Sequence, residues 1–383
     1  MFLKIFKCRK KSTKKDPSYV IISLFRKNYN RIGGLFLYII NHFIVYKKYS
    51  MYSKIKQEVI FVDVDENGVV RTDWKSDKDG TFMLGDSYKR LGNEKKAKRC
   101  CECGTYLEFK YFPSVKKRKL IGANFCKVRL CPMCTKRRSR KIYAQSYKVM
   151  QVASQKYEFI FLTLTQKNVS ADELKDELDK ILKAFNNFMR RKEMKAIKGW
   201  FRGLEITHNT DKKSKSYDTY HPHIHMILAV NKSYFKSRNY INQKKFRELW
   251  QESLGIEYEP MVNVKRFKAS NQKEIEKSLA ETSKYTVEKD DFLLEDDYEM
   301  TDKTVETLDK ALAYRRLVAW GGELKRIHKE LNLDDVETGD LVNTDLEDED
   351  LQGLDYYIEC VGWHFGISDY VYKNIRLPEE EQM

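Results

Sequence analysis

Alternating apolar and polar positions predict a β-strand at 220–230, with the sequence Tyr-His-Pro-His-Ile-His-Met-Ile-Leu-Ala-Val. The apolar side chains of one face are those of Ile224, Met226, Leu228 and Val230. Successive side chains of a strand point to opposite faces, so His223 and His225 lie together on the other face. Because Pro222 is tolerated only at a strand start or an edge, His221 joins them only if the strand begins early.

The same kind of pattern predicts a series of elements around this strand. In chain order they are a β-branched, aromatic-rich strand at 159–165, a helix opened by the capping box at 170–173, a strand at 200–208, the histidine strand, a helix at 246–254 and a strand at 262–267. This order predicts an α+β fold, a ferredoxin-like sandwich built on a central antiparallel sheet.

In that fold the strand that carries Glu205 pairs with the histidine strand as a hairpin. Glu205 is then the third candidate ligand of a metal ion beside His223 and His225, with His221 as an extra candidate. Two simpler interpretations stay open. The histidines can cap the edge of a sheet, and Glu205 can be an exposed acid on an edge strand.

A further helix is predicted from 271 to about 289, with a charged band opposite its apolar face. Tyr285 is the aromatic residue of that band, and Glu281 lies one turn before it, so the two are neighbours on a continuous helix. The chain has 24 tyrosines, and spacing alone fits a packing role for Tyr285 as well as a catalytic one.

The cysteines predict a structural zinc site. Cys100 and Cys103 form one Cys-x-x-Cys pair, Cys131 and Cys134 form another, and the span between the pairs suits a hairpin. Cys126 is a fifth candidate, so the spacing leaves open which four bind zinc. The alternative is a group of buried thiols without metal.

The balance of charge favours a polyanionic partner. The 383 residues carry a formal net charge of +16, although a run at 334–355 is acidic. Two basic runs flank the cysteines, and the residues predicted to contact DNA phosphates are Lys116, Lys117, Arg118, Lys119, Lys136, Arg137, Arg138 and Arg140. The alternative for such runs is a solvated face.

Composition divides the chain into six predicted segments. They are a basic and apolar extension at 1–50 that is open to being dispensable, a polar arm at 51–94 with one hairpin near Asn67 and Gly68, a zinc module at 95–145, an α+β core at 150–292, a helical region at 293–340 and an acidic tail at 341–383. The apolar run at 33–45 is shorter than the roughly 20 residues of a membrane helix. No small-residue cleavage site follows it, so we expect a cytoplasmic protein with reduced thiols.

Several motifs together resemble the replication initiator (Rep) proteins of rolling-circle plasmids of Gram-positive bacteria, in the HUH endonuclease superfamily. The similar stretches are Phe161-Leu-Thr-Leu-Thr165, His221-Pro-His-Ile-His-Met-Ile-Leu228, Glu281-Thr-Ser-Lys-Tyr285, and the cysteine segments at 103–109 and 125–139. The resemblance extends from about 95 to about 339. It implies that zinc is bound by Cys103, Cys126, Cys131 and Cys134, with Cys100 as an alternate.

The resemblance also implies a reaction. Tyr285 would attack the scissile phosphorus, keep the 5′-phosphate as a covalent ester and release a 3′-OH that primes synthesis. His223, His225 and Glu205 would hold Mg²⁺ or Mn²⁺. Glu281 would activate water for the last cleavage, which ends replication after one round.

The implied partners are origin DNA, single-stranded at the nick and duplex for recognition, and the host helicase and polymerase. Lys284 and Lys289 are candidates for lowering the tyrosine pKa or contacting phosphates. No membrane partner is expected, and the oligomeric state is left open, a homo-oligomer included.

Three other classes of protein compete with this interpretation. A single-tyrosine transposase would share the histidine motif but lack a long cysteine-rich region. A non-catalytic, zinc-containing regulator would bind origin DNA without needing Glu281 and Tyr285. A binuclear metallohydrolase would need further ligands after His225, where the chain has Met226.

Overall fold

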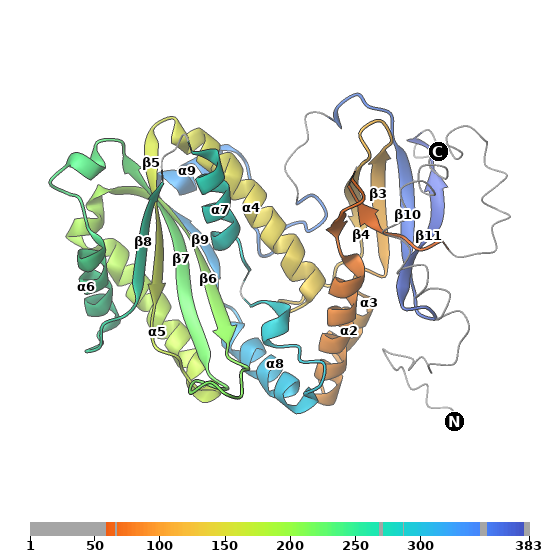
Figure 1. Ribbon diagram of the computed structural model, residues 1–383, viewed down its shortest axis with the longest axis horizontal. Coiled ribbons are helices and arrows are strands. Elements are labelled where there is room, and N and C mark those ends of the chain that lie inside the picture. The colour runs from red at the N-terminus through yellow and green to blue at the C-terminus, as the bar shows by residue number, and fades with distance from the viewer. Residues whose placement is uncertain (1–58, 66, 268–270, 286, 345–350, 379–383) are drawn as a thin grey trace. The chain divides into compact units, whose positions relative to one another are not determined.

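The structure is a computed structural model, and it describes residues 59–65, 67–267, 271–285, 287–344 and 351–378 (Figure 1). The predicted extension at 1–50 lies outside the described residues. Two compact units are present, which we call the five-stranded unit and the four-stranded unit. The five-stranded unit takes in 87–93 and 127–344, and the four-stranded unit takes in 59–86, 94–126 and 351–378. No helix among these residues is long and apolar enough to cross a membrane.

The five-stranded unit contains all four strands that the apolar pattern predicts. Its strands are β5 (Tyr157–Thr165), β6 (Ile197–His208), β7 (Tyr220–Asn231), β8 (Val262–Phe267) and β9 (Val318–Gly321). Their order is β8-β5-β7-β6-β9, and every neighbouring pair is antiparallel. The histidine strand β7 therefore lies inside the sheet between β5 and β6, which excludes the edge-strand alternative.

Helices cover both faces of this sheet. They are α4 (Pro132–Ser154), α5 (Ala171–Arg190), α6 (Gln243–Leu254), α7 (Gln272–Thr282), α8 (Tyr298–Leu312) and α9 (Gly322–Glu330), with short 3-10 turns at Lys192–Ala196, Tyr234–Lys236 and Lys289–Asp291. Figure 1 shows α5 and α6 on one side of the sheet and α4 and α7 on the other. The predicted capping box opens α5, where Ser170 and Glu173 make both reciprocal hydrogen bonds.

The prediction for α7 is wrong at its C-terminal end. The helix stops at Thr282, with Ser283 as its C-cap, and does not continue to 289. Tyr285 is therefore outside the helix, and the i, i+4 relation with Glu281 does not apply. The periodic pattern of polar and apolar residues does not show where tertiary packing ends a helix.

The four-stranded unit has a sheet in the order β11-β10-β3-β4. Its strands are β3 (Tyr106–Phe112), β4 (Lys117–Ala123), β10 (Tyr357–His364) and β11 (Asp369–Arg376). β3 and β4 form the hairpin expected between the cysteine pairs. An aromatic cluster packs on one face, where the Phe109 ring stacks on Phe61 and meets the edge of Trp74.

Two predicted segments at the ends of the described chain are more ordered than expected. The hairpin near Asn67 is confirmed as β1 (Asp63–Val64) and β2 (Val70–Thr72), but the polar arm also forms α2 (Trp74–Arg90), and α3 (Glu94–Glu102) follows it. The interpretation of 341–383 as an acidic tail is wrong for 357–376, because β10 and β11 belong to the sheet. The acidic run at 334–355 led to the prediction of a tail, although the strand pair of β10 and β11 follows it.

Candidate metal centre

The predicted ligands Glu205, His223 and His225 come together on β6 and β7. Glu205 lies opposite His223 in the ladder, and His225 follows on the same face, so the expected hairpin pairing is confirmed. Oε2 of Glu205 lies 3.2 Å from Nε2 of His223 and 3.0 Å from Nε2 of His225. The side chain of Glu205 is 8% exposed, which excludes an exposed edge acid.

The imidazoles are arranged as metal ligands would be. Nδ1 of His223 lies 3.1 Å from the carbonyl oxygen of His221, which can only accept a hydrogen bond. The proton of the neutral ring is then on Nδ1, and the Nε2 lone pair is directed toward Glu205. Nε2 of His225 is buried and has no hydrogen-bond partner among the described residues, despite its closeness to Glu205. A divalent cation would satisfy both lone pairs.

The electrostatics of Glu205 agree with this fit. Burial raises the pKa of Glu205, but the closeness of His223 and His225 brings the pKa below its ordinary value overall. Glu205 is therefore an anion at neutral pH. The three ligand atoms lie within 4.8 Å of one another, and His221 is not part of this group.

Residues of β5 fix the orientation of the His225 ring. Oγ1 of Thr163 lies 3.2 Å from Nδ1 of His225, and the Phe161 ring stacks on the imidazole with centroids 5.7 Å apart. Both residues belong to the first motif of the resemblance. Such supporting contacts hold a ligand in the orientation that binds metal.

A glycine allows the end of α7 to lie against the centre. Gly203 pairs with His225 in the β6–β7 ladder. A Cβ atom on Gly203 would lie 2.6 Å from the carbonyl oxygen of Thr282, which is closer than real contacts allow. Only a residue without a side chain permits this approach of helix to strand.

The end of α7 brings two charged groups to the centre. Oε1 of Glu281 lies 3.7 Å from Nε2 of His225. Nζ of Lys284 lies 3.9 Å from Oε1 of Glu205, 3.5 Å from Glu281 and 3.4 Å from Glu288. Burial lowers the pKa of Lys284, but these three carboxylates raise it above its usual value overall, so the ammonium is charged.

Tyr285 has other neighbours than this group of side chains. Its backbone N–H donates to Oγ of Ser139 at 3.2 Å, and the guanidinium of Arg138 lies 5.2 Å from its ring centroid. The residue is 4% exposed. Burial raises the pKa of the phenol although Arg138 and Arg129 lower it. Tyr285 in this conformation is a protonated, packed side chain.

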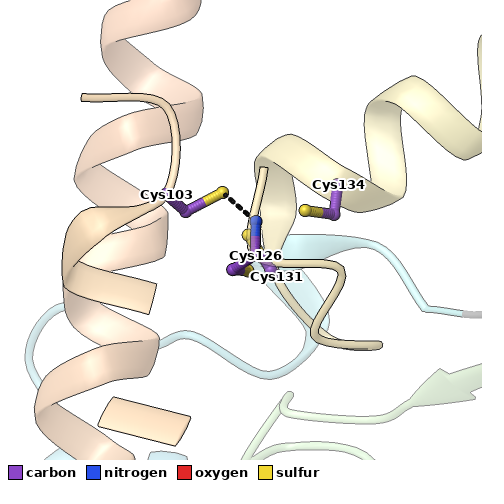
Figure 2. A group of neighbouring side chains, drawn as sticks. All are labelled: Cys103, Cys126, Cys131 and Cys134. Carbon is purple, nitrogen blue, oxygen red and sulfur yellow. Dashed lines mark hydrogen bonds between the residues drawn. The ribbon is translucent and has the colours of Figure 1, made fainter. Parts of the chain in front are cut away.

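Four cysteine sulfurs form the second group of candidate ligands. Those of Cys103, Cys126, Cys131 and Cys134 lie within 4.8 Å of one another, and these cysteines form no disulfide. Figure 2 shows the sulfurs of Cys103 and Cys134 directed toward the other two. The backbone N–H of Cys126 donates to Sγ of Cys103 at 3.3 Å, and that of Lys127 donates to Sγ of Cys134 at 3.2 Å. Four thiolates supported by N–H donors fit a zinc ion.

Comparison with known proteins agrees with the resemblance in the motifs. A family model described as "Replication protein" matches residues 117–371. A "Protein rep" of Bacillus amyloliquefaciens is 38% identical over 349 residues, which are 84% of this chain and 100% of that protein. A "Protein rep" of Lactiplantibacillus plantarum is 38% identical over 321 residues, 81% of this chain and 98% of that protein. The chain belongs to the Rep family of plasmid replication initiators. No solved structure matches it.

In this Rep family member, three of the predicted DNA contacts are buried. The Arg118 side chain is 4% exposed, and its Nε donates to Oε2 of Glu359 at 2.7 Å. Arg137 and Arg138 are 2% and 3% exposed and donate to backbone carbonyl groups. These arginines hold the fold together, so the prediction of DNA contact is wrong for them. Side chains that reach the surface are those of Lys116, Lys117, Lys119, Lys136 and Arg140.

The sequence pattern did not predict some of the residues around the candidate metal centre. Asp291 follows the predicted nucleophile, and burial together with the charges of Glu288 and Glu205 raises its pKa to about 6. Gly203 and Ser139 have roles that depend on long-range packing, which local spacing does not reveal. The burial of Arg137 and Arg138 did leave a signal, because they share a helical face with Cys134 and Ile142.

Proposed function

We propose that this protein starts rolling-circle replication of a plasmid by nicking one strand at the origin, as an HUH endonuclease. The arrangement of Glu205, His223 and His225, with Glu281 and Lys284 at its rim, is the observation that supports the proposal most strongly. The βαββαβ strand order of the unit agrees with it. Membership of the Rep family gives the biological setting.

Each residue has a role in the proposed reaction. A Mg²⁺ or Mn²⁺ ion bound by the triad would supply charge that polarises the scissile phosphate. The Lys284 ammonium positions the same phosphate. Oη of Tyr285 attacks phosphorus, the P–O3′ bond breaks, and the leaving 3′ oxygen takes up a proton to become the primer. The phenol proton of Tyr285 is lost to a base or to solvent in that step.

This role requires Tyr285 to leave its packed position. The neighbouring Lys284 already reaches Glu205, and residues 283–285 are not helical. Rotation of the backbone after Ser283 would turn the phenol from Arg138 toward the triad. We propose that binding of single-stranded DNA accompanies this rotation. The rotation also lowers the pKa of the Tyr285 phenol, because the side chain is then no longer buried.

The remaining parts of the proposal concern binding. Zinc held by the four cysteines would stabilise the region that precedes α4. Lys116, Lys117, Lys119, Lys136 and Arg140 would contact phosphates of the origin. The host helicase and polymerase would then extend the new 3′ end in the cytoplasm.

A non-catalytic regulator that binds origin DNA is the second candidate, and the burial of Tyr285 favours it. Supercoiled plasmid with a candidate origin, incubated with purified protein and Mn²⁺, separates the two. We expect relaxed plasmid and protein linked to a 5′ end, and Tyr285→Phe should give neither product. Binding without relaxation by the wild-type protein would support the regulator.

A further inference from the structure

A groove lies between α4 and α7, beside the candidate metal centre. Its volume is about 410 Å³, and its lining residues are Ser139, Arg140, Tyr143, Ala144, Ala280, Ser283 and Lys284. Most of the lining is apolar, but it includes two cationic side chains. Arg140 belongs to α4, and Lys284 follows the end of α7. Volumes of this order accept a group the size of a nucleobase.

Residues on one face of α4 lead into the groove. Lys136, Arg140, Tyr143 and Tyr147 follow one another at intervals of four, three and four residues, so they lie along a single line of the helix. All four are half-exposed, whereas the arginines between them are buried. The rings of Tyr143 and Tyr147 are close to parallel, with centroids 6.3 Å and planes 22° apart. Two cations followed by two aromatic rings suit the binding of single-stranded DNA, because cations contact its phosphates and aromatic rings stack on its bases.

The charges around the groove favour a base beside Tyr143 and phosphates beside Arg140 and Lys284. Burial raises the pKa of Tyr143, and the charge of Glu276 raises it further, so a phosphate beside Tyr143 would meet a negative charge. Arg140 and Lys284 are the cationic groups of the lining. Nζ of Lys284 lies 3.9 Å from Oε1 of Glu205, which connects the groove directly to the candidate metal centre.

We propose that this groove binds a base of the single-stranded DNA next to the scissile phosphate, stacked on Tyr143, while Arg140 and Lys284 contact the phosphates on either side. The proposal rests on the proposed nicking function, because the neighbouring phosphate is the one that would be cut. Tyr143 is thus a positioning residue that sets which phosphate reaches the triad.

The test compares two probes that differ only in their bases. One is a fluorescent oligothymidylate of about 20 nucleotides, and the other is an abasic oligomer of the same length and charge. Tyr143→Ala should weaken binding of oligothymidylate about 5- to 100-fold, since stacking carries this much affinity per base. Tyr143→Phe should bind as the wild type does. Arg140→Gln should weaken binding of both probes and lower the salt dependence.

Two controls make the result decisive. Tyr314 is fully exposed in the same unit, so Tyr314→Ala should leave both affinities unchanged. Unchanged affinity of Tyr143→Ala for the abasic probe shows that the fold is intact. Equal loss on both probes, or no loss on either, would overturn the proposal. So would a changed oligomeric state of Tyr143→Ala with unchanged DNA affinity, because the groove would then hold a second copy of the chain.

Plasmid relaxation distinguishes failure of this inference from failure of the proposed function. A wild-type protein that stacks oligothymidylate through Tyr143 but relaxes no plasmid would refute the nicking function and leave the groove assignment standing. Relaxation at equal rate and equal plasmid KM by the wild type and by Tyr143→Ala would refute the groove assignment alone.

Discussion

At the scale of single residues, His223 and His225 are positioned by different neighbours for the same task. The carbonyl of His221 holds one ring and Thr163 the other, while both Nε2 atoms face Glu205. His223→Ala or His225→Ala should therefore abolish nicking of single-stranded origin DNA and weaken Mn²⁺ binding. Duplex binding should stay near normal, because these groups act on one phosphate. Nicking at the wild-type rate by either variant, in a gel assay with Mn²⁺, would contradict the assignment.

Glu281 has a separate predicted role. Its carboxylate lies at the rim of the centre, 3.7 Å from His225, and also 3.5 Å from Lys284. If it activates water for the final cleavage, Glu281→Ala should nick and form the covalent adduct but fail to terminate. The product would be DNA longer than one plasmid length, measured on denaturing gels. Normal termination would mean that Glu281 only pairs with Lys284, a surface contact of about 0.3–0.5 kcal/mol.

The cysteine residues allow a matched comparison. Cys131 is one of the four clustered sulfurs, whereas Cys100 is equally buried but outside the group. Dialysis that removes Mg²⁺ or Mn²⁺ from the candidate site at Glu205 should leave one zinc per wild-type chain, because thiolates hold zinc more firmly than these ions are held. Cys131→Ser should lose that zinc together with thermal stability, and Cys100→Ser should keep it. Elemental analysis that finds no zinc in the wild type would refute the site.

At the scale of elements, the contact between α7 and β6 decides which side chains meet at the centre. Gly203→Ala would place a methyl group against the Thr282 carbonyl, so the end of α7 must move away. Overpacking of this kind costs roughly 1–3 kcal/mol. We expect Mn²⁺ affinity to remain, since Glu205 and the histidines lie on strands, while nicking falls strongly because Glu281 and Lys284 are displaced. Calorimetric titration measures the Mn²⁺ affinity, and the nicking assay measures the activity. Loss of Mn²⁺ affinity together with nicking would refute the separate roles of the strand residues and the end of α7.

The elements also show how far the sequence could predict the site. Alternation in β7 determined which face carries the histidines, and the order of elements determined that Glu205 would be their neighbour. The position of Tyr285 could not be predicted in the same way. Its direction depends on where α7 ends and on contacts with Arg138 and Ser139, which lie about 146 residues earlier in the chain. Periodicity describes a helix face but not the packing that terminates the helix.

At the scale of the whole molecule, the sequence predicted the five-stranded sheet better than the four-stranded one. β10 pairs with β3, and Sγ of Cys360 contacts Glu108 across a separation of 252 residues. Composition before β10 is strongly acidic, which favoured the interpretation as a tail. Pairing between the two ends of a chain leaves no local pattern, because each strand would look the same with another neighbour.

The pairing of β10 predicts that the C-terminal segment is indispensable. β10 lies between β11 and β3, and the buried apolar side chains that it contributes include those of Tyr357, Ile358, Val361 and Trp363. Each stabilises folding by roughly 1.5–3 kcal/mol, and their sum is comparable with the roughly 5–15 kcal/mol that stabilises a typical domain. Loss of Glu359 would also leave the Arg118 charge buried without this partner.

Removal of 345–383 should therefore unfold the four-stranded unit, while removal of 379–383 alone should have no such effect. Hydrogen exchange with mass spectrometry provides the measurement. In the longer truncation the amides of β3 and β4 should lose protection, because β3 loses its partner β10 and the aromatic cluster beneath the sheet is exposed. The amides of β5, β6 and β7 should keep theirs, since the five-stranded sheet contains no residue from the removed segment. Full protection of β3 after the longer truncation would instead support the interpretation of 341–383 as a dispensable tail.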